Sequence, residues 1–239
     1  YYLPNQEEPY SGENLCVYLS NGQYYSQGEI KKGLRHGKWT FWSENGQISK
    51  ERNYKDGNPV SQTQYVYNDN SQILFIRNYS GLPNDNNLID ETRYKYHANG
   101  QLKSEGNYKD GKWNGNRTSW HENGQKLEEV NFKNDKKHGK WTSWYENGQK
   151  ERDVNLKDGK HDGKITRWYE NGQKWYEGFY KDDKMIGKST GWYENGQKKE
   201  DSNYKDGKLD GKVTFWNETG KKTTRKYKDG VCISGDCPK

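Results

Sequence analysis

Apolar and polar positions recur along this chain with a fixed period. The clearest copy is residues 192–207, WYENGQKKEDSNYKDG, and close copies begin at Trp42, Trp120, Trp144 and Trp168. Measured at the turn glycine, the copies recur every 24 residues, with intervals of 25 and 29 on either side of Ser71, which replaces that glycine in a worn copy. Such a period is the signature of a stack of one supersecondary unit. Within each copy the residues alternate as in strands, and helical periodicity is absent.

Two turn signals divide each copy into two strands. Glu-Asn-Gly-Gln lies between alternating segments and predicts a hairpin. Lys-Asp-Gly-Lys is followed by a second glycine and is interpreted as a longer connection. The sequence therefore predicts an all-β fold, an elongated single-layer antiparallel β-meander solenoid of about nine 24-residue hairpin repeats.

The ends and the middle of the chain depart from this period. Residues 1–15 lack the pattern and contain Pro4 and Pro9, which predicts an N-terminal cap over the first sheet edge. The repeat array is expected over 16–230, with an irregular part and an insertion at 58–98. A C-terminal cap or tail is expected over 231–239.

The register of the hairpins decides which side chains share a face. If Glu-Asn-Gly is a three-residue loop ending in a glycine bulge, Trp192 shares a face with Thr190, Lys198, Ser202 and Tyr204. We expect this register because it gathers the aromatic residues on one face, opposite ladders of Gln, acid and Asn. A two-residue turn would instead place the Trp with the acid five residues after the glycine. The first aromatic column, interpreted as structural, comprises Tyr18, Trp42, Tyr67, Tyr96, Trp120, Trp144, Trp168, Trp192 and Trp216.

Composition limits the function classes. A hydrophobic content of 28% and a mean hydropathy of -1.53 are typical of disorder, but aromatic residues make up 15% and recur at fixed repeat positions. The net charge of +6 is spread evenly by the repeat, whereas nucleic-acid binders gather their basic residues, so no nucleic-acid partner is expected. No stretch reaches the roughly 18 apolar residues of a membrane span. The five histidines lack metal-ligand spacing and no catalytic triad stands out, so we expect no metal, no cofactor and no enzyme activity.

The repeated Trp-Tyr-Glu-Asn-Gly-Gln-Lys, Tyr-Lys-Asp-Gly-Lys and Gly-Lys-x-Thr-x-Trp segments resemble the variant type of the MORN repeat over residues 16–230. Much of the bacterial branch of that family is labelled as the YwqK-type antitoxin of a toxin–antitoxin system. The resemblance implies a sheet of hairpins and a non-enzymatic scaffold that binds a protein, with an antitoxin or immunity-like partner of a toxin as the specific form. Two other functions are alternatives: a surface or extracellular structural protein that assembles end to end, and a lipid or glycan surface binder.

The insertion suggests one binding site. Insertions in solenoids map to loops on one face, often the binding face. The candidate partner-binding loop residues are Leu82, Asn84, Asp85, Leu88 and Ile89. The alternative is a worn repeat with a tolerated loop.

The three cysteines all lie in the terminal copies. Cys232 and Cys237 are close enough in sequence to form a disulfide that locks the tail, which favours a periplasmic, secreted or cell-surface location over the cytoplasm. Cys16 would then be a free thiol near the first sheet edge. In the end-to-end alternative, Cys16 joins chains into a homo-oligomer.

Overall fold

The structure, a computed structural model, describes residues 8–83 and 87–238. These residues contain strands and turns but no helix, and none of their segments meets the length and apolarity of a membrane-crossing helix. The chain forms two compact units. Unit 1 comprises residues 1–95 and 106–112, and unit 2 comprises residues 96–105 and 113–239.

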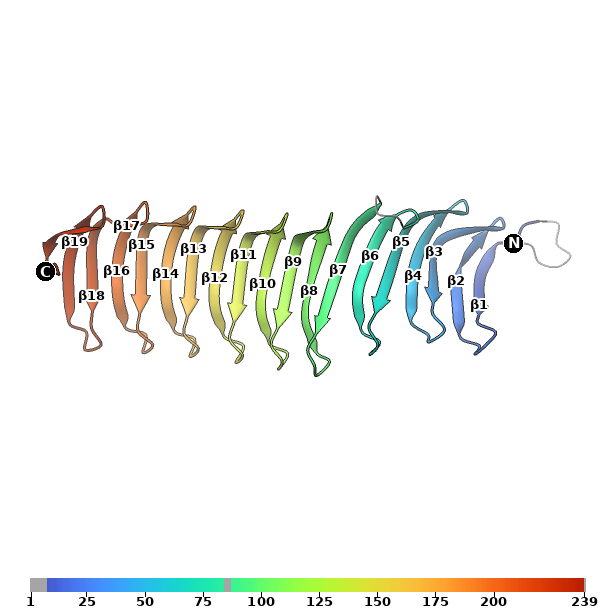
Figure 1. The fold of residues 1–239 in the computed structure, drawn as a ribbon, viewed down its shortest axis with the longest axis horizontal. Helices are drawn as coiled ribbons and strands as arrows, with labels where there is room; N and C mark the ends of the chain where they lie inside the picture. The colour runs from blue at the N-terminus through green and yellow to red at the C-terminus, as the bar shows by residue number, and fades with distance from the viewer. Residues whose placement is uncertain (1–7, 84–86, 239) are drawn as a thin grey trace. The chain divides into compact units, whose positions relative to one another are not determined.

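Unit 1 is an antiparallel meander in which each strand pairs with the next one along the chain (Figure 1). Its strands are β1 (Gly12–Val17), β2 (Tyr24–Lys31), β3 (Leu34–Trp42), β4 (Ile48–Lys55), β5 (Asn58–Tyr67), β6 (Ile73–Ser80) and β7 (Leu88–Tyr96). Strand β8 (Leu102–Lys109) is divided between the two units.

Unit 2 repeats the same hairpin arrangement (Figure 1). Strand β16 pairs with both β17 and β18, which are two halves of one repeat strand. The strands are β9 (Lys112–Trp120), β10 (Lys126–Lys133), β11 (Lys136–Trp144), β12 (Lys150–Lys157), β13 (Lys160–Trp168), β14 (Lys174–Lys181), β15 (Lys184–Trp192), β16 (Lys198–Lys205), β17 (Lys208–Leu209), β18 (Gly211–Trp216), β19 (Lys222–Lys228) and β20 (Val231–Gly235).

The predicted all-β meander of successive hairpins is therefore confirmed. The segments assigned to caps also contribute strands, because β1 begins at Gly12 and β20 occupies Val231–Gly235. The boundary placed between residues 15 and 16 falls inside β1.

The Glu-Asn-Gly-Gln segment forms the loop with the glycine bulge. Tyr193 N donates to Gln197 O at 2.9 Å, Gly196 N donates to Tyr193 O at 2.9 Å, and Gly196 has φ of 82°. Three residues thus lie between the closing pair, and the positive φ explains the glycine.

A second irregularity reverses the expected faces. Trp192 pairs with Lys198 but Gly191 pairs with Glu200, so one extra residue stands on β16. This shift pairs Thr190 with the acid Asp201 and places Ser202 and Tyr204 on the other face. The expectation that Trp192 shares a face with Ser202 and Tyr204 is wrong. We call the face with Trp192 and Asp201 the ladder face, and the face with Ser202 and Tyr204 the core face.

The Lys-Asp-Gly-Lys segment is a tight turn rather than a longer connection. Lys157 pairs directly with Lys160, and the two residues between them have positive φ, 51° at Asp158 and 88° at Gly159. These angles are typical of a type I′ hairpin. The second glycine belongs to a bulge beyond the turn, where Leu156 pairs with His161 but Val154 pairs with Ile165.

The apolar core lies on the core face of each unit. In unit 2, Val154, Ile165 and Leu156 are buried, and Trp141, Tyr176 and Tyr180 pack against them. In unit 1, the buried cluster is Ile30, Trp39, Phe41 and Tyr54. Burial of one such side chain contributes about 1.5–3 kcal/mol, so several small clusters hold the array together.

Candidate partner-binding surfaces

The ladder face of unit 2 alternates tryptophan and lysine from copy to copy. The Nζ atoms of Lys126, Lys150, Lys174 and Lys198 lie 5.6–5.7 Å from the ring centroids of Trp144, Trp168, Trp192 and Trp216. Each lysine also pairs with the acid three residues later, as in Lys150–Asp153 at 2.9 Å and Lys174–Glu177 at 2.8 Å. The rings are half-buried. The cation–π contacts join neighbouring copies, and the ion pairs hold each lysine in place within its own strand.

The acids of this face are bound to their neighbours. Asp201 Oδ1 accepts a hydrogen bond from Thr190 Oγ1 at 2.7 Å, and Asp201 Oδ2 pairs with Lys198 at 2.7 Å. The pKa of the Glu177 carboxyl is lowered, mainly by the hydrogen bond that Lys174 donates to it. Burial acts in the opposite direction but is outweighed. The ladder acids therefore serve contacts within and between copies.

We expect the ladder to make stability depend on acid pH. Because the folded-state pKa of Glu177 lies below its ordinary value of about 4.3, its contribution is fully present above that pH and is lost as the pH falls through the folded-state pKa. The free energy of unfolding in urea should hold between about pH 7 and 5 and decline below about pH 4. The Lys174→Met variant should show a shallower decline. Parallel pH profiles for the two proteins would contradict this role for the ion pair.

The turn edge of unit 2 carries a second set of contacts between copies. The hydroxyl of Tyr169 donates to Trp192 O at 2.9 Å, and Tyr145 and Tyr193 make the same bond to the next copy. His97 and His121 replace this tyrosine, with Nε2 at 2.9 Å from Trp120 O and 3.1 Å from Trp144 O. Tyr18 also has this role in unit 1, because its hydroxyl donates to Trp42 O at 2.9 Å. Tyr18 is therefore equivalent to Tyr145, which follows Trp144 of the aromatic column, rather than to Trp144 itself.

The asparagine of the turn motif binds two copies at once. Asn147 Nδ2 donates to Glu170 O of the next copy at 2.9 Å, and its Oδ1 accepts from Gln149 N at 2.9 Å. Asn99, Asn123 and Asn171 make the same pair of bonds. The Asn-Gly pair therefore shapes the loop and joins it to the next one.

We predict that Asn147→Ala lowers the free energy of unfolding by about 1–2 kcal/mol, because both hydrogen bonds are lost. In the described structure, Asn195 forms only the bond within its own loop, from Gln197 N at 2.9 Å. Asn195→Ala should therefore cost about half as much. Urea unfolding of the two variants measures the difference, and equal losses would show that the bond between copies contributes nothing.

Two of the other three histidines bind nearby acids at the opposite edge of unit 2. His138 Nδ1 lies 3.3 Å from Asp158 Oδ1, and His161 Nδ1 lies 2.9 Å from Asp183 Oδ1. Among the described residues, no three His, Cys, Asp or Glu side chains gather in a way that could hold a metal ion.

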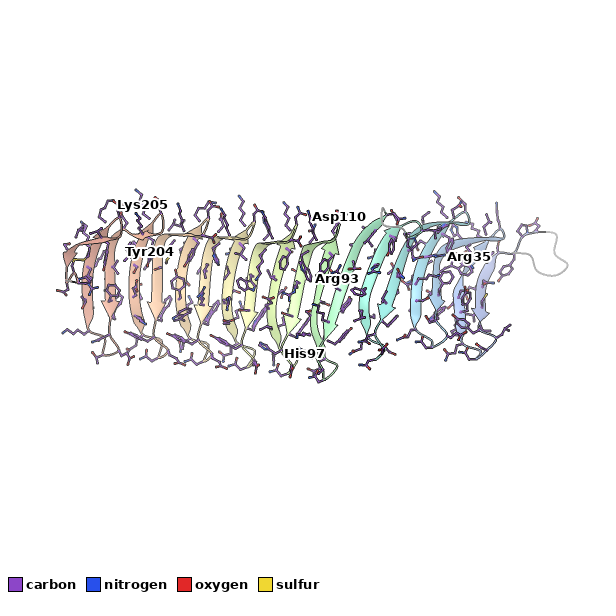
Figure 2. The ribbon with its side chains drawn as sticks, in the orientation of Figure 1. Arg35, Arg93, His97, Asp110, Tyr204 and Lys205 are labelled. Carbon is purple, nitrogen blue, oxygen red and sulfur yellow. A yellow bond between two sulfur atoms is a disulfide. The ribbon has the colours of Figure 1, made fainter. Side chains whose placement is uncertain are left out.

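The core face of unit 1 carries a group of cations that the sequence reasoning missed. The Arg35 Cζ, Lys50 Nζ and Arg52 Cζ atoms lie 5.5, 5.2 and 5.8 Å from the ring centroid of Phe41. Arg35 also donates to the Tyr54 hydroxyl at 3.1 Å (Arg35 is labelled in Figure 2). All three cations are half-buried. Aromatic rings and cations thus form one cluster on this face.

The sequence feature that could have revealed this cluster is a pair of cations at positions where the other copies do not have two. At the positions of Lys50 and Arg52, four and six residues after the turn glycine, other copies carry at most one cation. In four of these copies the pairs are Glu128 and Val130, Arg152 and Val154, Tyr176 and Gly178, and Glu200 and Ser202.

A second charged group lies on the same face of unit 1. Glu91, 5% exposed, accepts hydrogen bonds from the Nε atoms of Arg77 and Arg93. Burial opposes ionisation of Glu91, but the two arginines outweigh it and lower the pKa of the carboxyl. The Arg93 guanidinium stacks 3.8 Å from the Tyr108 ring centroid (Arg93 is labelled in Figure 2). A carboxylate between two arginines is therefore built into this face.

The insertion is only partly a loop. Leu88 and Ile89 lie in β7, where Leu88 pairs with Tyr79, so they belong to a strand. Leu82 is exposed and lies outside the strands. Asn84 and Asp85 lie outside the described residues.

The three cysteines differ in bonding. Cys232 and Cys237 form a disulfide with a Cα–Cα distance of 5.8 Å. Cys16 is a free thiol in β1, half-buried, with Sγ 3.3 Å from Asn14 Oδ1.

Comparison with known proteins identifies the repeat. The MORN repeat variant pattern matches residues 35–56, 92–110, 113–134, 137–158, 162–182 and 185–206, which together are more than half of the chain. No curated protein matches the chain. Among solved structures, the Photorhabdus luminescens Tc holotoxin pore shares 14% identity over 92% of this chain, with a TM-score of 0.25, and this chain spans only 15% of its length. A Bacteroides fragilis protein of unknown function shares 8% identity over 74% of this chain and 91% of its own, with a TM-score of 0.15. Neither similarity carries an argument about function.

Proposed function

Because this chain belongs to the MORN repeat variant family, we propose that it is a non-enzymatic scaffold that binds a protein partner. MORN repeats mark a repeat-containing binding scaffold. One observation carries the non-enzymatic part: the side chains best suited to acid–base chemistry are engaged in structural contacts. The ladder acids bind Lys and Thr, and His97 and His121 bind the backbone of the next copy.

The exposed apolar side chains of unit 1 support a protein as the partner. Leu15, Val17, Tyr24, Tyr25, Val60, Leu82 and Ile89 are each close to half exposed. Aromatic and aliphatic side chains of this kind form the buried parts of protein–protein interfaces. Leu82 and Ile89 belong to the insertion, so the candidate loop contributes to this proposal.

Affinity capture from the native lysate tests the function. We expect one stoichiometric protein, identified by mass spectrometry. A toxin among the captured proteins would support the more specific function of an antitoxin or immunity-like partner. That more specific function is suggested by the family resemblance alone. Retention on immobilised glycans or lipid vesicles with no protein partner would support the lipid or glycan alternative and contradict the proposal.

A second candidate, end-to-end assembly, is favoured by the outer strands. Among the described strands, β1 pairs only with β2 and β20 only with β19, and each exposes two aliphatic side chains: Leu15 and Val17 on β1, Val231 and Ile233 on β20. Unpaired strand edges invite pairing with another chain. Light scattering and non-reducing electrophoresis of wild type and Cys16→Ser distinguish this candidate: it requires multimers, and a monomer with one internal disulfide would exclude it.

A further inference from the structure

We propose that Lys50 and Arg52, together with Arg35, form a carboxylate-binding site on the core face of unit 1 that receives an acidic segment of the protein partner. The inference rests on the proposed function and names the chemistry of the partner's contact surface.

The first step in the argument is the missing counter-charge. In the described part of the chain, neither Lys50 nor Arg52 lies within ion-pair distance of an Asp or Glu side chain. Glu51 lies between them in sequence but on the ladder face. There its carboxylate pairs with Lys38 Nζ at 2.7 Å and accepts a hydrogen bond from the Tyr65 hydroxyl at 3.2 Å. Burial and the neighbouring Arg52 and Arg35 lower the pKa of the Lys50 ammonium. Three cations therefore share one partly dehydrated site, which an anion would stabilise.

The second step is that the site is held in place before any ligand binds. Arg52 Nε donates to Oε1 of Gln62, whose side chain is only 4% exposed. Arg35 is held by the Tyr54 hydroxyl at 3.1 Å and lies 4.4 Å from the ring centroid of buried Trp39. Ordered cations lose less conformational entropy when a partner binds than free surface side chains do.

The third step is that unit 1 already contains a carboxylate bound between cations on the same face. Lys50 pairs with Gln64, Gln64 with Arg77, and Arg77 with Glu91, which forms one row of side chains across β4 to β7. At the β7 end of this row, the Glu91 carboxylate bridges Arg77 and Arg93. At the β4 end, no carboxylate of the described residues bridges Lys50 and Arg52 in this way. Guanidinium groups match carboxylates in geometry, so a carboxylate from the partner would complete the second end of the row as Glu91 completes the first.

The fourth step is that the fold does not require these cations. The equivalent positions in other copies hold Glu128 and Val130 or Glu200 and Ser202, and those copies form the same hairpin. The hairpin forms without cations at these positions, and in this copy the two cations repel each other. We therefore assign Lys50 and Arg52 to ligand binding rather than to stabilisation of the fold.

Isothermal titration calorimetry of the full chain with poly-L-glutamate at low salt tests the site. We expect saturable binding that weakens at least about tenfold in the Lys50→Ala/Arg52→Ala variant, since both charges face the ligand. The matched control is Lys38→Ala/Lys55→Ala, which removes the same charge from the ladder face of the paired strands β3 and β4. The control should bind within about twofold of wild type.

Three outcomes would overturn the proposal. Equal losses in the two double variants would show that the attraction is general charge rather than a site. No saturable binding by the wild type would show that carboxylates are not ligands. Tighter binding of inorganic phosphate, single-stranded DNA or phosphatidylserine vesicles through the same two residues would assign the site to a phosphate ligand. Thermal unfolding of the Lys50→Ala/Arg52→Ala variant should show that it is fully folded at the titration temperature, because relief of the repulsion between the two charges offsets part of the cost of losing the Arg52–Gln62 hydrogen bond.

The two proposals fail in different ways. If the lysate yields no partner while poly-L-glutamate binds through Lys50 and Arg52, the scaffold function fails and the carboxylate site stands. If a partner is captured equally well by the Lys50→Ala/Arg52→Ala variant, the scaffold function stands and the site is wrong.

Discussion

Trp39→Ala should lower the free energy of unfolding of unit 1 by about 3–5 kcal/mol. The Trp39 side chain is 0% exposed, and its Nε1 donates to Glu29 O at 3.1 Å. Its ring lies 6.3 Å from the ring centroids of both Phe41 and Tyr54. Removing it leaves a cavity at the centre of the buried cluster and takes away the indole donor to Glu29 O. Urea unfolding followed by circular dichroism measures the loss.

Trp144→Ala is the matched control for this prediction. Trp144 belongs to the Trp column of the ladder face, is half-buried and contacts Lys126. Trp144→Ala should lower the free energy of unfolding by clearly less than Trp39→Ala, because part of the Trp144 ring is already exposed to water. A larger loss for Trp144 than for Trp39 would mean that the apolar core lies on the Trp-column face.

Gly28→Ala should destabilise the protein by about 1–3 kcal/mol through overpacking. Gly28 pairs directly with Trp39, and a Cβ atom at Gly28 would lie 2.4 Å from Cδ2 of the Trp39 ring. The indole therefore rests on the glycine backbone and must move if a methyl group is added. Because the ring is buried on all sides, it cannot move without disturbing its neighbours.

Gly191→Ala provides the control at a strand glycine with room for a side chain. The nearest atoms to a Cβ at Gly191 lie at 3.9 Å. We expect an unchanged or slightly higher melting temperature, because alanine loses less conformational entropy on folding than glycine. The Gly28→Ala/Trp39→Ala double variant should lose less than the sum of the single losses. Additive losses would show that Gly28 and Trp39 do not interact.

The period of the sequence was enough to predict the strands and the bulged loop, because Gly196 and its equivalents need positive φ. It was not enough to predict the faces. The extra residue opposite Trp192 changes the parity, and the adjacent Lys198 and Lys199 are polar residues that can stand on either face. The buried positions also hold small polar residues, such as Ser202 at 1% exposure, which hid the core face. Two irregularities in one hairpin must both be counted before the faces can be assigned.

The cationic site escaped sequence reasoning for a related reason. We compared the positions that the copies share, and shared residues such as Asn147 and Glu177 serve contacts between copies. Lys50 and Arg52 stand out only when one copy is compared with the rest at fixed positions. Glu51 lies between them in sequence but cannot neutralise them, because adjacent residues of a strand point to opposite faces.

The central claim is that the charged residues of the ladder face serve structural contacts, whereas Lys50 and Arg52 on the core face of unit 1 bind the protein partner. The most direct test is the amount of partner retained from native lysate by wild type, by Lys50→Ala/Arg52→Ala and by Lys38→Ala/Lys55→Ala. We predict that the first variant loses the partner and that the second retains it at the wild-type level. Retention by the first variant, or an equal loss from both, would contradict the claim.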